Sequence, residues 1–349
     1  MTVTARWRQR PPGSNWGEFG PDDQLGMLNT LTPEKVRAGV AEVREGRAFC
    51  LSLPLDHPTQ NVLNQRRHPP RLRPTIRNDL PNYNFALGDL TPGLTDVVCD
   101  DAALIHLQYS TQWDSLAHVG SMFDADEDGV AEKVFYNGYR ADEHIRGPED
   151  SAAPGDGEVP SCSADALGIE NLAVSCVQGR AVLVDLRHQF GDAKKVVGAK
   201  DLLAVMAADG VVVEPGDMLC IHTGFAALIL ESSGKDRAAQ EFLNEACCAL
   251  DGRDPALLEW ISQSGIAALI ADNYAVESLP ARPGSSSCAS LPLHEHCIFK
   301  RGIPLGELWH LSPLAVWLRA HRRNRFLLTA PPLRLPGAVG SPTTPVATV

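Results

Sequence analysis

The stretch from Leu104 to Val119 alternates polar with apolar residues more clearly than any other part of the chain. Read with a period of two, one face carries imidazole, carboxamide, hydroxyl and carboxylate groups, while the other face is mainly aliphatic and aromatic. This pattern predicts a strand with one face packed in a core. The residues on the polar face are His106, Gln108, Ser110, Gln112 and Asp114.

The polar face of this stretch has two interpretations. Oxygen and imidazole groups that converge on one side are suited to a divalent metal ion or a polar substrate. His118 follows Asp114 by four residues, so one helical turn would bring its ring to the same side. The alternative is an ordinary half-exposed strand followed by a surface histidine, and the spacing alone leaves both interpretations open.

The first third of the chain predicts an arm, a helix and a long loop. Residues 1–31 are rich in Gly, Pro and Asp. Residues 56–96 are broken by prolines and lack periodicity, which is typical of a lid, a binding loop or a plain surface loop. A helix is predicted to begin at Thr32-Pro33-Glu34, with Thr as the N-cap and Pro in the first turn. The expected arm anchors are Trp16, Phe19 and Leu28, and the expected helix has an apolar stripe of Val36, Val40 and Val43 and ends at Gly46.

The second half of the chain alternates short apolar runs with helical patterns, which is typical of an α/β protein. We treat residues 1–349 as a single domain. Polar residues at strand ends are candidates for chemistry, although each could equally be a cap or a satisfied hydrogen bond. The predicted strands are 181–186, 218–223 and 266–270, the predicted helices are 199–209, 236–250 and 254–264, and the polar strand-end residues are Asp185, His188, His222, Asp272 and Glu277.

Composition and charge limit the possible binding partners and the expected location of the protein. The formal net charge of −12 argues against a nucleic acid or an anionic membrane as the main partner. The nine cysteines are odd in number and form no C-x-x-C, which indicates free thiols in a reducing compartment. No apolar run resembles a signal peptide or a membrane span, so we expect a cytoplasmic location.

A second unusual stretch, Leu291-Pro292-Leu293-His294-Glu295-His296, is followed by Glu307. His294 and Glu307 could complete a site with the first stretch. His296 competes with His294, and the two share a face on a strand but not on a helix. The acidic run Asp124 to Asp128 lacks the remaining ligands of a calcium loop.

Several common catalytic motifs are absent from the sequence. There is no G-x-G-x-x-G, P-loop, H-E-x-x-H or G-x-S-x-G, so dinucleotide, nucleoside-triphosphate, zincin and serine-hydrolase chemistry lose their usual support. The chemistry that remains is hydrolysis by a metal-activated water or a histidine base, at a site assembled from two distant segments of the chain.

The first stretch resembles the signature H-x-G-T-H-x-D-x-P-x-H of the cyclase family, metal-dependent hydrolases that include bacterial kynurenine formamidase and isatin hydrolase. Positions 108–118 read Q-x-S-T-Q-x-D-x-L-x-H, so the threonine, the aspartate and the last histidine match. Both earlier histidines are glutamines, and the glycine and proline are replaced.

The resemblance extends along nearly the whole chain, to the long branch that shows T-Q-W-D and is similar to trans-dienelactone hydrolase. The matching segments are S-N-W-G-E-F-G-P-D-D-Q-L-G near the start, G-D-M-L-C-I-H-T-G at 216–224, A-D-N-Y-A-V-E at 271–277, L-P-L-H at 291–294, G-I-P-L-G-E at 302–307 and the terminal G-S-P.

The resemblance implies a role for each matching residue. His118 corresponds to the histidine that acts as general base or proton shuttle, and His294 is also a catalytic candidate because it could stabilise an oxyanion. Replacement of two imidazoles by carboxamides makes the ligand set oxygen-rich, which favours Mn²⁺ over Zn²⁺. The positions that correspond to the family's metal ligands are Gln108, Gln112, Asp114, His294 and Glu307.

The resemblance further implies a mixed-sheet, β-barrel-like α/β core surrounded by helices, assembled as a homodimer or homotetramer. The expected activity is metal-dependent hydrolysis of a lactone, a cyclic amide or a related amide or ester in a small molecule. Two alternatives are a lyase or cyclase that uses the same histidine base, and a metal-free relative that only binds a small molecule.

Overall fold

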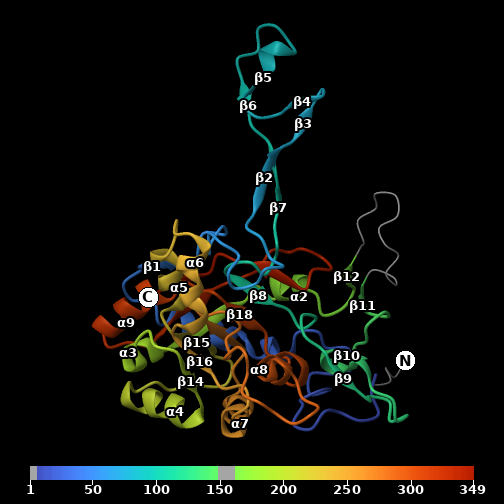
Figure 1. The fold of residues 1–349 in the computed structure, drawn as a ribbon, viewed down its shortest axis with the longest axis vertical. Helices are drawn as coiled ribbons and strands as arrows, with labels where there is room; N and C mark the ends of the chain where they lie inside the picture. Colours follow the sequence, from blue (N-terminus) through green and yellow to red (C-terminus); the bar gives the residue numbers. More distant parts are fainter. Residues whose placement is uncertain (1–5, 148–161) are drawn as a thin grey trace.

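A nine-stranded mixed sheet forms the centre of the computed structural model, which describes residues 6–147 and 162–349 (Figure 1). The sequence at 147–162, G-P-E-D-S-A-A-P-G-D-G-E-V-P-S-C, predicts a loop, which lies almost wholly outside the described residues. The sheet curls into a half-barrel, which confirms the predicted fold class. Four central strands are parallel, and antiparallel strands flank them on both sides. In spatial order the strands are β1 (Ala48–Cys50), β21 (Val346–Thr348), β19 (Arg325–Thr329), β13 (Gln178–Asp185), β15 (Met218–His222), β17 (Ala268–Ala271), β18 (Leu305–Glu307), β8 (Gln112–Asp114) and β20 (Gly340–Pro342).

Both faces of the sheet are buried, which is why its parallel strands read as unbroken apolar runs. Successive residues of β13 enter opposite cores: Val182 and Val184 join one, and Ala181 and Leu183 join the other. The first core also contains side chains of α4 (Ala199–Ala208) and α7 (Pro255–Ser264), and the second contains side chains of α2 (Ile169–Val174) and α9 (Ser312–Ala320).

Two of the three helices predicted in the second half are confirmed, as α4 and α7. The helix predicted over 236–250 is wrong, because only its first part is helical. Its end forms β16 (Cys248–Leu250), which pairs with β14 (Lys195–Val197) and buries Cys248 and Leu250. Other short helices are α3 (Leu186–Phe190), α5 (Phe225–Glu231), α6 (Arg237–Gln240), η1 (Gly26–Thr30), η3 (Tyr136–Gly138) and η4 (Glu241–Glu245). Two of the small two-stranded sheets pair β9 (Ser121–Phe123) with β10 (Glu132–Val134) and β11 (Ile145–Arg146) with β12 (Ser163–Ala164).

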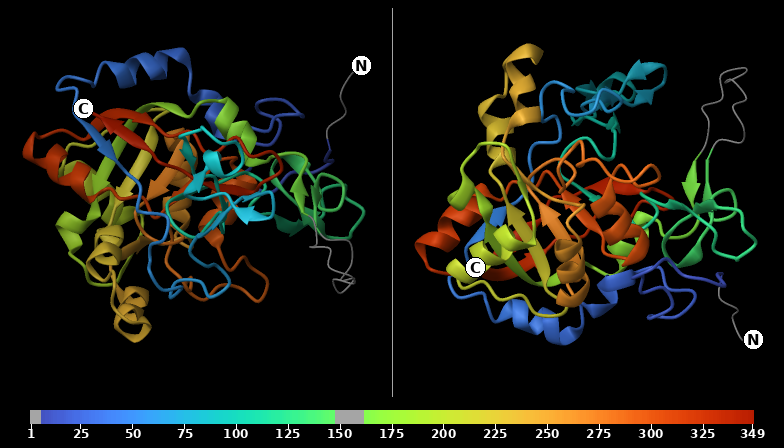
Figure 2. Two further views of the ribbon diagram at one scale, coloured as in Figure 1. Left: turned by 90° about the horizontal axis from the view of Figure 1, so that it is seen from above. Right: turned by 60° about the horizontal axis from the view of Figure 1, so that its bottom comes forward.

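The helix α1 (Pro33–Val40) begins where the sequence predicts but ends six residues before Gly46, and it lies along the outside of the body (Figure 2). The predicted valine stripe is wrong, because Val40 is 54% exposed. The close contact is made by Gly39, where a Cβ atom would lie 2.8 Å from the carbonyl carbon of Gly179. The absence of a side chain, rather than an apolar stripe, therefore allows α1 to pack on β13. Of the predicted anchors of the N-terminal arm, Trp16 and Leu28 are buried and Phe19 is half-buried.

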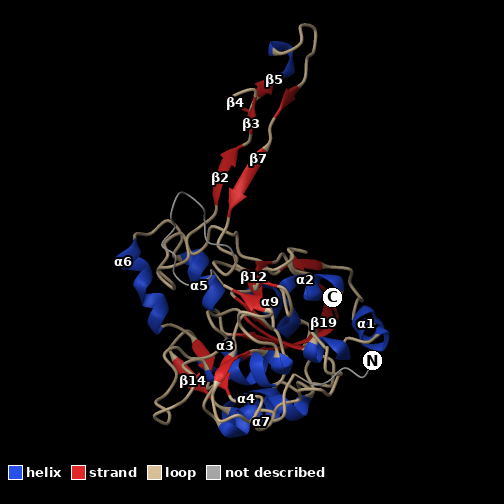
Figure 3. Ribbon diagram, turned by 90° about the vertical axis from the view of Figure 1, so that its right-hand side faces the viewer, coloured by secondary structure: helices blue, strands red, loops and turns tan. Residues whose placement is uncertain are grey.

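The long stretch at 56–96 is not a featureless loop. Residues 71–104, which begin within this stretch, form an arm that projects from the body (Figures 1 and 3). In this arm β2 (Arg71–Pro74) pairs with β7 (Asp101–Leu104). We call these residues the β2–β7 arm. Its outer part holds β3 (Ile76–Arg77), β4 (Leu80–Pro81), β5 (Phe85–Ala86), η2 (Leu87–Asp89) and β6 (Val97–Val98).

The strand predicted across residues 104–119 is divided in two. β7 ends at Leu104, the chain turns through residues 105–111, and β8 has only three residues. The break occurs where the chain leaves the arm: His106 bonds the carbonyl of His68 across the arm's base. His106 and Ser110 therefore do not share a strand face with Gln112 and Asp114. Among the described residues, no helix is long and apolar enough to cross a membrane.

Candidate metal centre

Asp114, His294 and Glu307 meet in the interior of the protein. Each is at most 3% exposed, and one donor atom of each lies within 4.8 Å of the donors of the other two. The sheet register explains the meeting of Asp114 and Glu307, because Gln112 of β8 stands directly opposite Glu307 of β18. Side chains two residues apart share a strand face, so Asp114 projects to the same side.

Glu277 holds His294 in place. The residue follows β17, and its carboxylate accepts the backbone N–H groups of Leu293 and His294 at the start of α8 (Pro292–His294). The same carboxylate bonds Nδ1 of His294 at 2.7 Å, which leaves Nε2 directed to Glu307 at 3.2 Å. A carboxylate behind a histidine fixes its tautomer and orientation at metal sites. The sequence indicated Glu277 only as a polar strand-end residue.

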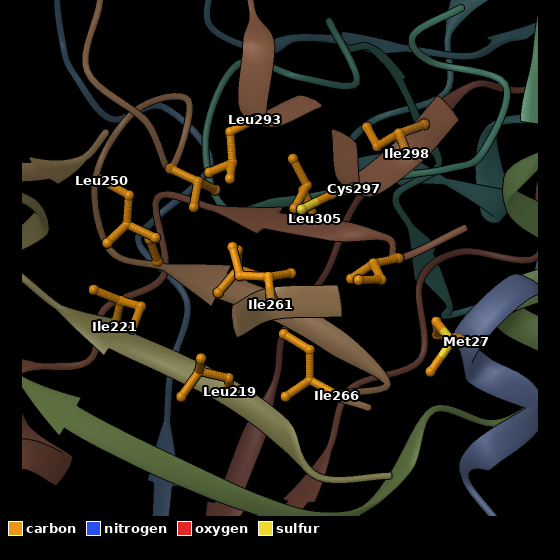
Figure 4. Close-up of a cluster of buried hydrophobic side chains, with 14 of the residues drawn as sticks. Met27, Leu219, Ile221, Leu250, Ile261, Ile266, Leu293, Cys297, Ile298 and Leu305 are labelled. Carbon is orange, nitrogen blue, oxygen red and sulfur yellow. The ribbon is translucent and has the colours of Figure 1, made fainter. Parts of the chain in front are cut away.

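The backbone that carries these groups is anchored in the core. Leu293 precedes His294, and Leu305 lies two residues before Glu307. Both leucines are fully buried and belong to one apolar cluster (Figure 4). The two ligand candidates are therefore presented by rigid backbone.

Gln112 belongs to the site. Its Nε2 lies 3.2 Å from Oδ1 of Asp114 and 3.3 Å from Oε2 of Glu307. Its Oε1 and the Oδ2 of Asp114 are buried without a hydrogen-bond partner in the described part of the chain. Such orphaned acceptors are rare in protein interiors and call for an explanation.

Gln108 is placed differently from the sequence-based expectation. It lies in the turn before β8, and no hydrogen bond joins its side chain to the three donors within the described residues. Its carboxamide packs on Gly340 of β20, where a Cβ atom would lie 2.5 Å from Nε2 of Gln108. A side chain at position 340 would therefore displace Gln108.

Of the two remaining histidine candidates, His118 borders the site and His296 does not. Nε2 of His118 lies 3.7 Å from Oδ1 of Asp114, so the ring borders the site. His296 lies in η5 (Glu295–Lys300), a π-helical segment that directly continues α8, and its Nε2 bonds the hydroxyl of Ser262 at 2.9 Å. The helical backbone gives His294 and His296 different faces, which leaves only His294 in the cluster.

The charges of the cluster are unbalanced. Burial raises the pKa of Asp114, and repulsion from Glu307 adds to this effect. Burial alone would lower the pKa of His294, but its hydrogen bonds to Glu277 and Glu307 raise it to about 10. Burial also opposes ionisation of Glu307, yet the bond to His294 and nearby positive charge lower its pKa. Three buried carboxyl groups thus share one imidazolium.

The residues present fit a divalent cation. Two carboxylates and an imidazole form a three-ligand set, and catalytic metal sites commonly have three protein ligands with a position left open. A cation would also give the orphaned Oδ2 of Asp114 a partner. Gln112 could add its amide oxygen after rotation of the carboxamide, since the NH₂ group now faces the two carboxylates.

A second histidine–carboxylate cluster, which we call the His222 cluster, consists of the buried His222 and the half-buried Asp185, Ser312 and Arg319. Nδ1 of His222 lies 2.8 Å from Oδ1 of Asp185, and its Nε2 lies 2.9 Å from the hydroxyl of Ser312. Arg319 bonds the other oxygen of Asp185 at 2.9 Å. Asp272 borders the cluster, with its carboxylate accepting the backbone N–H groups of Thr223 and Gly224.

The acidic turn after β9 also gathers carboxylates. Asp124, Asp126 and Asp128 come within the same 4.8 Å of one another, but they are not buried. Asp124 accepts the backbone N–H groups of Asp128 and Gly129, as in an ordinary polar turn. Oδ1 of Asp126 is buried without a hydrogen-bond partner among the described residues, but Arg140 lies 3.8 Å from the other oxygen of this carboxylate and supplies a positive partner without an ion.

The sequence and the fold are similar to those of one known protein family. A family model described as "Putative cyclase" matches residues 50–278. The chain belongs to the cyclase family. A crystal structure described as a novel cyclase shares 30% sequence identity with this cyclase-family chain and covers 98% of it, with 100% of the other chain aligned and a TM-score of 0.74.

More distant solved structures share the cyclase-family fold. Isatin hydrolase A from Labrenzia aggregata is 13% identical, with a TM-score of 0.54 and coverage of 90% of this chain and 97% of its own. Isatin hydrolase A from Ralstonia solanacearum is 15% identical, with a TM-score of 0.52 and the same coverages. No curated protein sequence matches the chain.

Proposed function

We propose that this cyclase-family chain is a metal-dependent hydrolase that opens a lactone, a cyclic amide or a related amide or ester. The observation that carries the proposal is the convergence of Asp114, His294 and Glu307, from distant segments, into one buried cluster with orphaned acceptors. Buried carboxylates with too few positive partners are costly unless a cation joins them.

Each residue of the site has a distinct part in the proposed reaction. Asp114, His294 and Glu307 would hold the ion, which when bound supplies Lewis-acid activation of a water molecule and of the substrate carbonyl. His118 stands 3.7 Å from Asp114, beyond hydrogen-bonding distance, so its ring is free to accept a proton from the attacking water. Glu277 keeps His294 in one orientation.

The chemistry of the donors supports manganese ahead of zinc. Two carboxylates and a nearby carboxamide outnumber the single imidazole, and oxygen-rich sets favour harder ions than Zn²⁺. A protein loaded with Mn²⁺ should therefore turn over faster than the same protein loaded with Zn²⁺.

The proposal is tested by metal analysis and turnover together. Protein purified without chelator is analysed for divalent metals and then assayed on lactones, cyclic imides and N-formyl aromatic amides, before and after chelation and metal replacement. We expect one ion per chain and turnover that follows metal content. Protein that contains no metal, and shows no turnover with any added ion, contradicts the proposal. Oxygen-18 from solvent water in the product separates hydrolysis from a lyase or cyclase reaction.

We further propose that the chain associates with copies of itself through the β2–β7 arm. Leu72, Ile76, Val97 and Leu104 of the arm are each more than half exposed, and exposed apolar patches commonly mark interfaces. Light scattering of the full chain should show an oligomer, and exchange of Leu72 and Val97 for Ser should release monomers. All nine cysteines are free thiols, which supports a proposed cytoplasmic location.

A further inference from the structure

A cavity of about 520 Å³ lies apart from the ligand candidates of the metal centre. It is enclosed by the segment before the β2–β7 arm, the β14–β16 pair and the loop after β17. Among the described residues, its wall includes Glu277, whose carboxylate is bonded to His294, but none of the three candidate ligands. Its volume is in the range of small-molecule sites, so the cavity can admit a ligand of its own.

The wall of this cavity contains a hydrogen-bond acceptor without a donor. Asn273 borders the cavity and is 4% exposed. Its Nδ2 lies 3.2 Å from the carbonyl oxygen of Cys248 and 3.5 Å from that of Val276. Because both neighbours are acceptors, they fix the NH₂ group of the carboxamide toward the backbone. The Oδ1 atom is then buried without a partner in the described chain, and a ligand that donates a hydrogen bond would satisfy it.

The loop that carries Asn273 has an uncommon backbone conformation. Ala275 and Val276 have φ angles of 70° and 60°. This left-handed region is unfavourable for residues with a Cβ atom, and most of all for a β-branched residue such as Val276. Such strain persists where the surrounding structure holds it, and it clusters at binding and active sites. Here Leu250 of β16 donates its N–H to the carbonyl of Val276 at 3.2 Å, which keeps the loop at the cavity wall.

One basic side chain of the cavity has no acidic partner. Lys194 pairs with Glu245 at 3.0 Å, and Lys195 pairs with Asp201 at 2.8 Å. Arg66 also borders the cavity and is exposed, and no carboxylate of the described residues lies within 4.0 Å of its guanidinium. The positive charge available to a ligand in this cavity is therefore that of Arg66.

Much of the remaining wall is apolar. Phe225 and Leu243 are buried in one apolar cluster, and Leu63 packs against the same cluster. Tyr274 adds an aromatic ring, and its hydroxyl accepts a hydrogen bond from Asn64 at 3.2 Å. Aromatic and apolar side chains with a few polar groups are the usual lining of a small-molecule site.

We propose that this cavity is a second ligand site, which binds a small aromatic carboxylic acid that carries a hydroxyl or amino group. The ring lies against the apolar wall, the carboxylate pairs with Arg66, and the hydroxyl or amino group donates to Oδ1 of Asn273. The inference goes beyond the proposed hydrolase function and does not depend on it, because the candidate metal ligands lie outside the cavity.

The first test compares three compounds by calorimetry on the full chain. 3-Hydroxybenzoate has both polar groups, benzoate lacks the donor, and methyl 3-hydroxybenzoate lacks the charge. We expect one molecule of 3-hydroxybenzoate to bind per chain. Benzoate should bind about 3–10-fold more weakly, the range for one neutral hydrogen bond, and the ester about 2–5-fold more weakly, the range for an exposed ion pair. Equal affinities for the three compounds, or no saturable binding, would overturn the proposal.

The second test places the ligand within the protein. Ala249 borders the cavity from β16, between Cys248 and Leu250, which enter the core. Ala249→Phe should fill the space and weaken binding at least about 10-fold, because the ring of the ligand loses its buried contacts. Binding at wild-type affinity in a folded Ala249→Phe protein, checked by thermal melting, would contradict the site.

Two further variants assign the polar contacts. Asn273→Ala should make 3-hydroxybenzoate and benzoate bind equally, and Arg66→Gln should remove the difference between the acid and its ester. Arg44→Gln makes the same charge change at an exposed arginine outside the cavity and should alter no affinity. Arg66→Gln is exposed and unpaired, so its result stands even if Asn273→Ala does not fold. An unchanged preference for the acid in Arg66→Gln would overturn the assignment.

Titration of chelated and metal-loaded protein separates this site from the candidate metal centre. We expect equal affinities for 3-hydroxybenzoate in the two forms. Binding that disappears with the metal would place the acid at the metal centre and overturn the second site. Turnover of lactones and amides, measured separately, decides the hydrolase proposal whichever result is obtained here.

Discussion

Two histidine–carboxylate clusters, one buried and one partly buried, lie at strand ends of the nine-stranded sheet, and their charges are balanced differently. In the His222 cluster, both oxygens of Asp185 are bonded, one to His222 and one to Arg319. In the candidate metal centre, Asp114 retains an orphaned oxygen, and no arginine or lysine bonds its carboxyl group in the described chain. The same residue types therefore form a closed network in one place and an open one in the other.

The pKa values of Asp185 and Asp114 follow the same division. Burial opposes ionisation of Asp185, but the bonds to His222 and Arg319 lower its pKa to about 2. Burial raises the pKa of Asp114, and its neighbours do not overcome this effect. A satisfied cluster stabilises the fold by itself, whereas an unsatisfied one needs a ligand. The comparison teaches that hydrogen-bond satisfaction, rather than residue type, identifies the functional cluster.

The largest effect is expected from a substitution that removes a ligand from the candidate metal centre. Asp114→Asn removes a charged ligand and should reduce both metal content and turnover to background, because the remaining donors cannot balance the charge of a divalent ion. The matched change in the other cluster, Asp185→Asn, should leave metal content and turnover nearly unchanged. Metal analysis and steady-state kinetics measure both. Full metal occupancy in Asp114→Asn would show that the centre is not where we place it.

The next effect concerns proton transfer rather than metal binding. His118→Ala should lower kcat by about 10²–10⁴-fold, the range for a lost general base, while metal content stays at the wild-type level. His188→Ala removes an exposed ring near the His222 cluster and serves as the control with unchanged kcat. If His118→Ala turns over at the wild-type rate, another group accepts the proton.

A smaller effect tests the support behind the ligand. Glu277→Gln keeps the shape of the side chain but weakens its bond to Nδ1 of His294, so the metal affinity should fall by about 10–100-fold, as for other outer-shell partners. Competition with a metal-binding dye measures the affinity. Ser262→Ala, which removes the partner of the neighbouring His296, should leave it unchanged. An affinity unaffected by Glu277→Gln would mean that packing alone orients His294.

Elements with clear local patterns could be predicted from the sequence. The helix α7 begins after the N-cap Asp254, whose side chain accepts the N–H of Ala256, and it ends at Gly265 in a left-handed conformation. The strands β13 and β15 are marked by apolar runs that match burial on both faces. The resemblance to the cyclase family predicted Asp114, His294 and Glu307 as metal ligands, and the structure brings these three residues together.

Features that depend on distant contacts could not be predicted. The alternation from His106 to Asp114 continues smoothly through the turn at the base of the β2–β7 arm, because a turn and a strand can share the same polar pattern. The position of Gln108 depends on Gly340, more than two hundred residues away. The difference between Glu277 and Asp185, both polar residues at strand ends, appears only when every hydrogen bond is counted.

The smallest expected effect concerns stability and its dependence on pH. Because the pKa of Asp185 is lowered from 3.8 to about 2, its ionised form stabilises the fold above pH 4, and this contribution is lost as the pH falls through 2. Asp185→Asn should therefore lower the free energy of unfolding by about 2 kcal/mol at pH 7. Denaturant titrations at several pH values should show the wild type and the variant converging between pH 4 and 2. A constant difference across that range would mean that Asp185 acts through packing instead of charge.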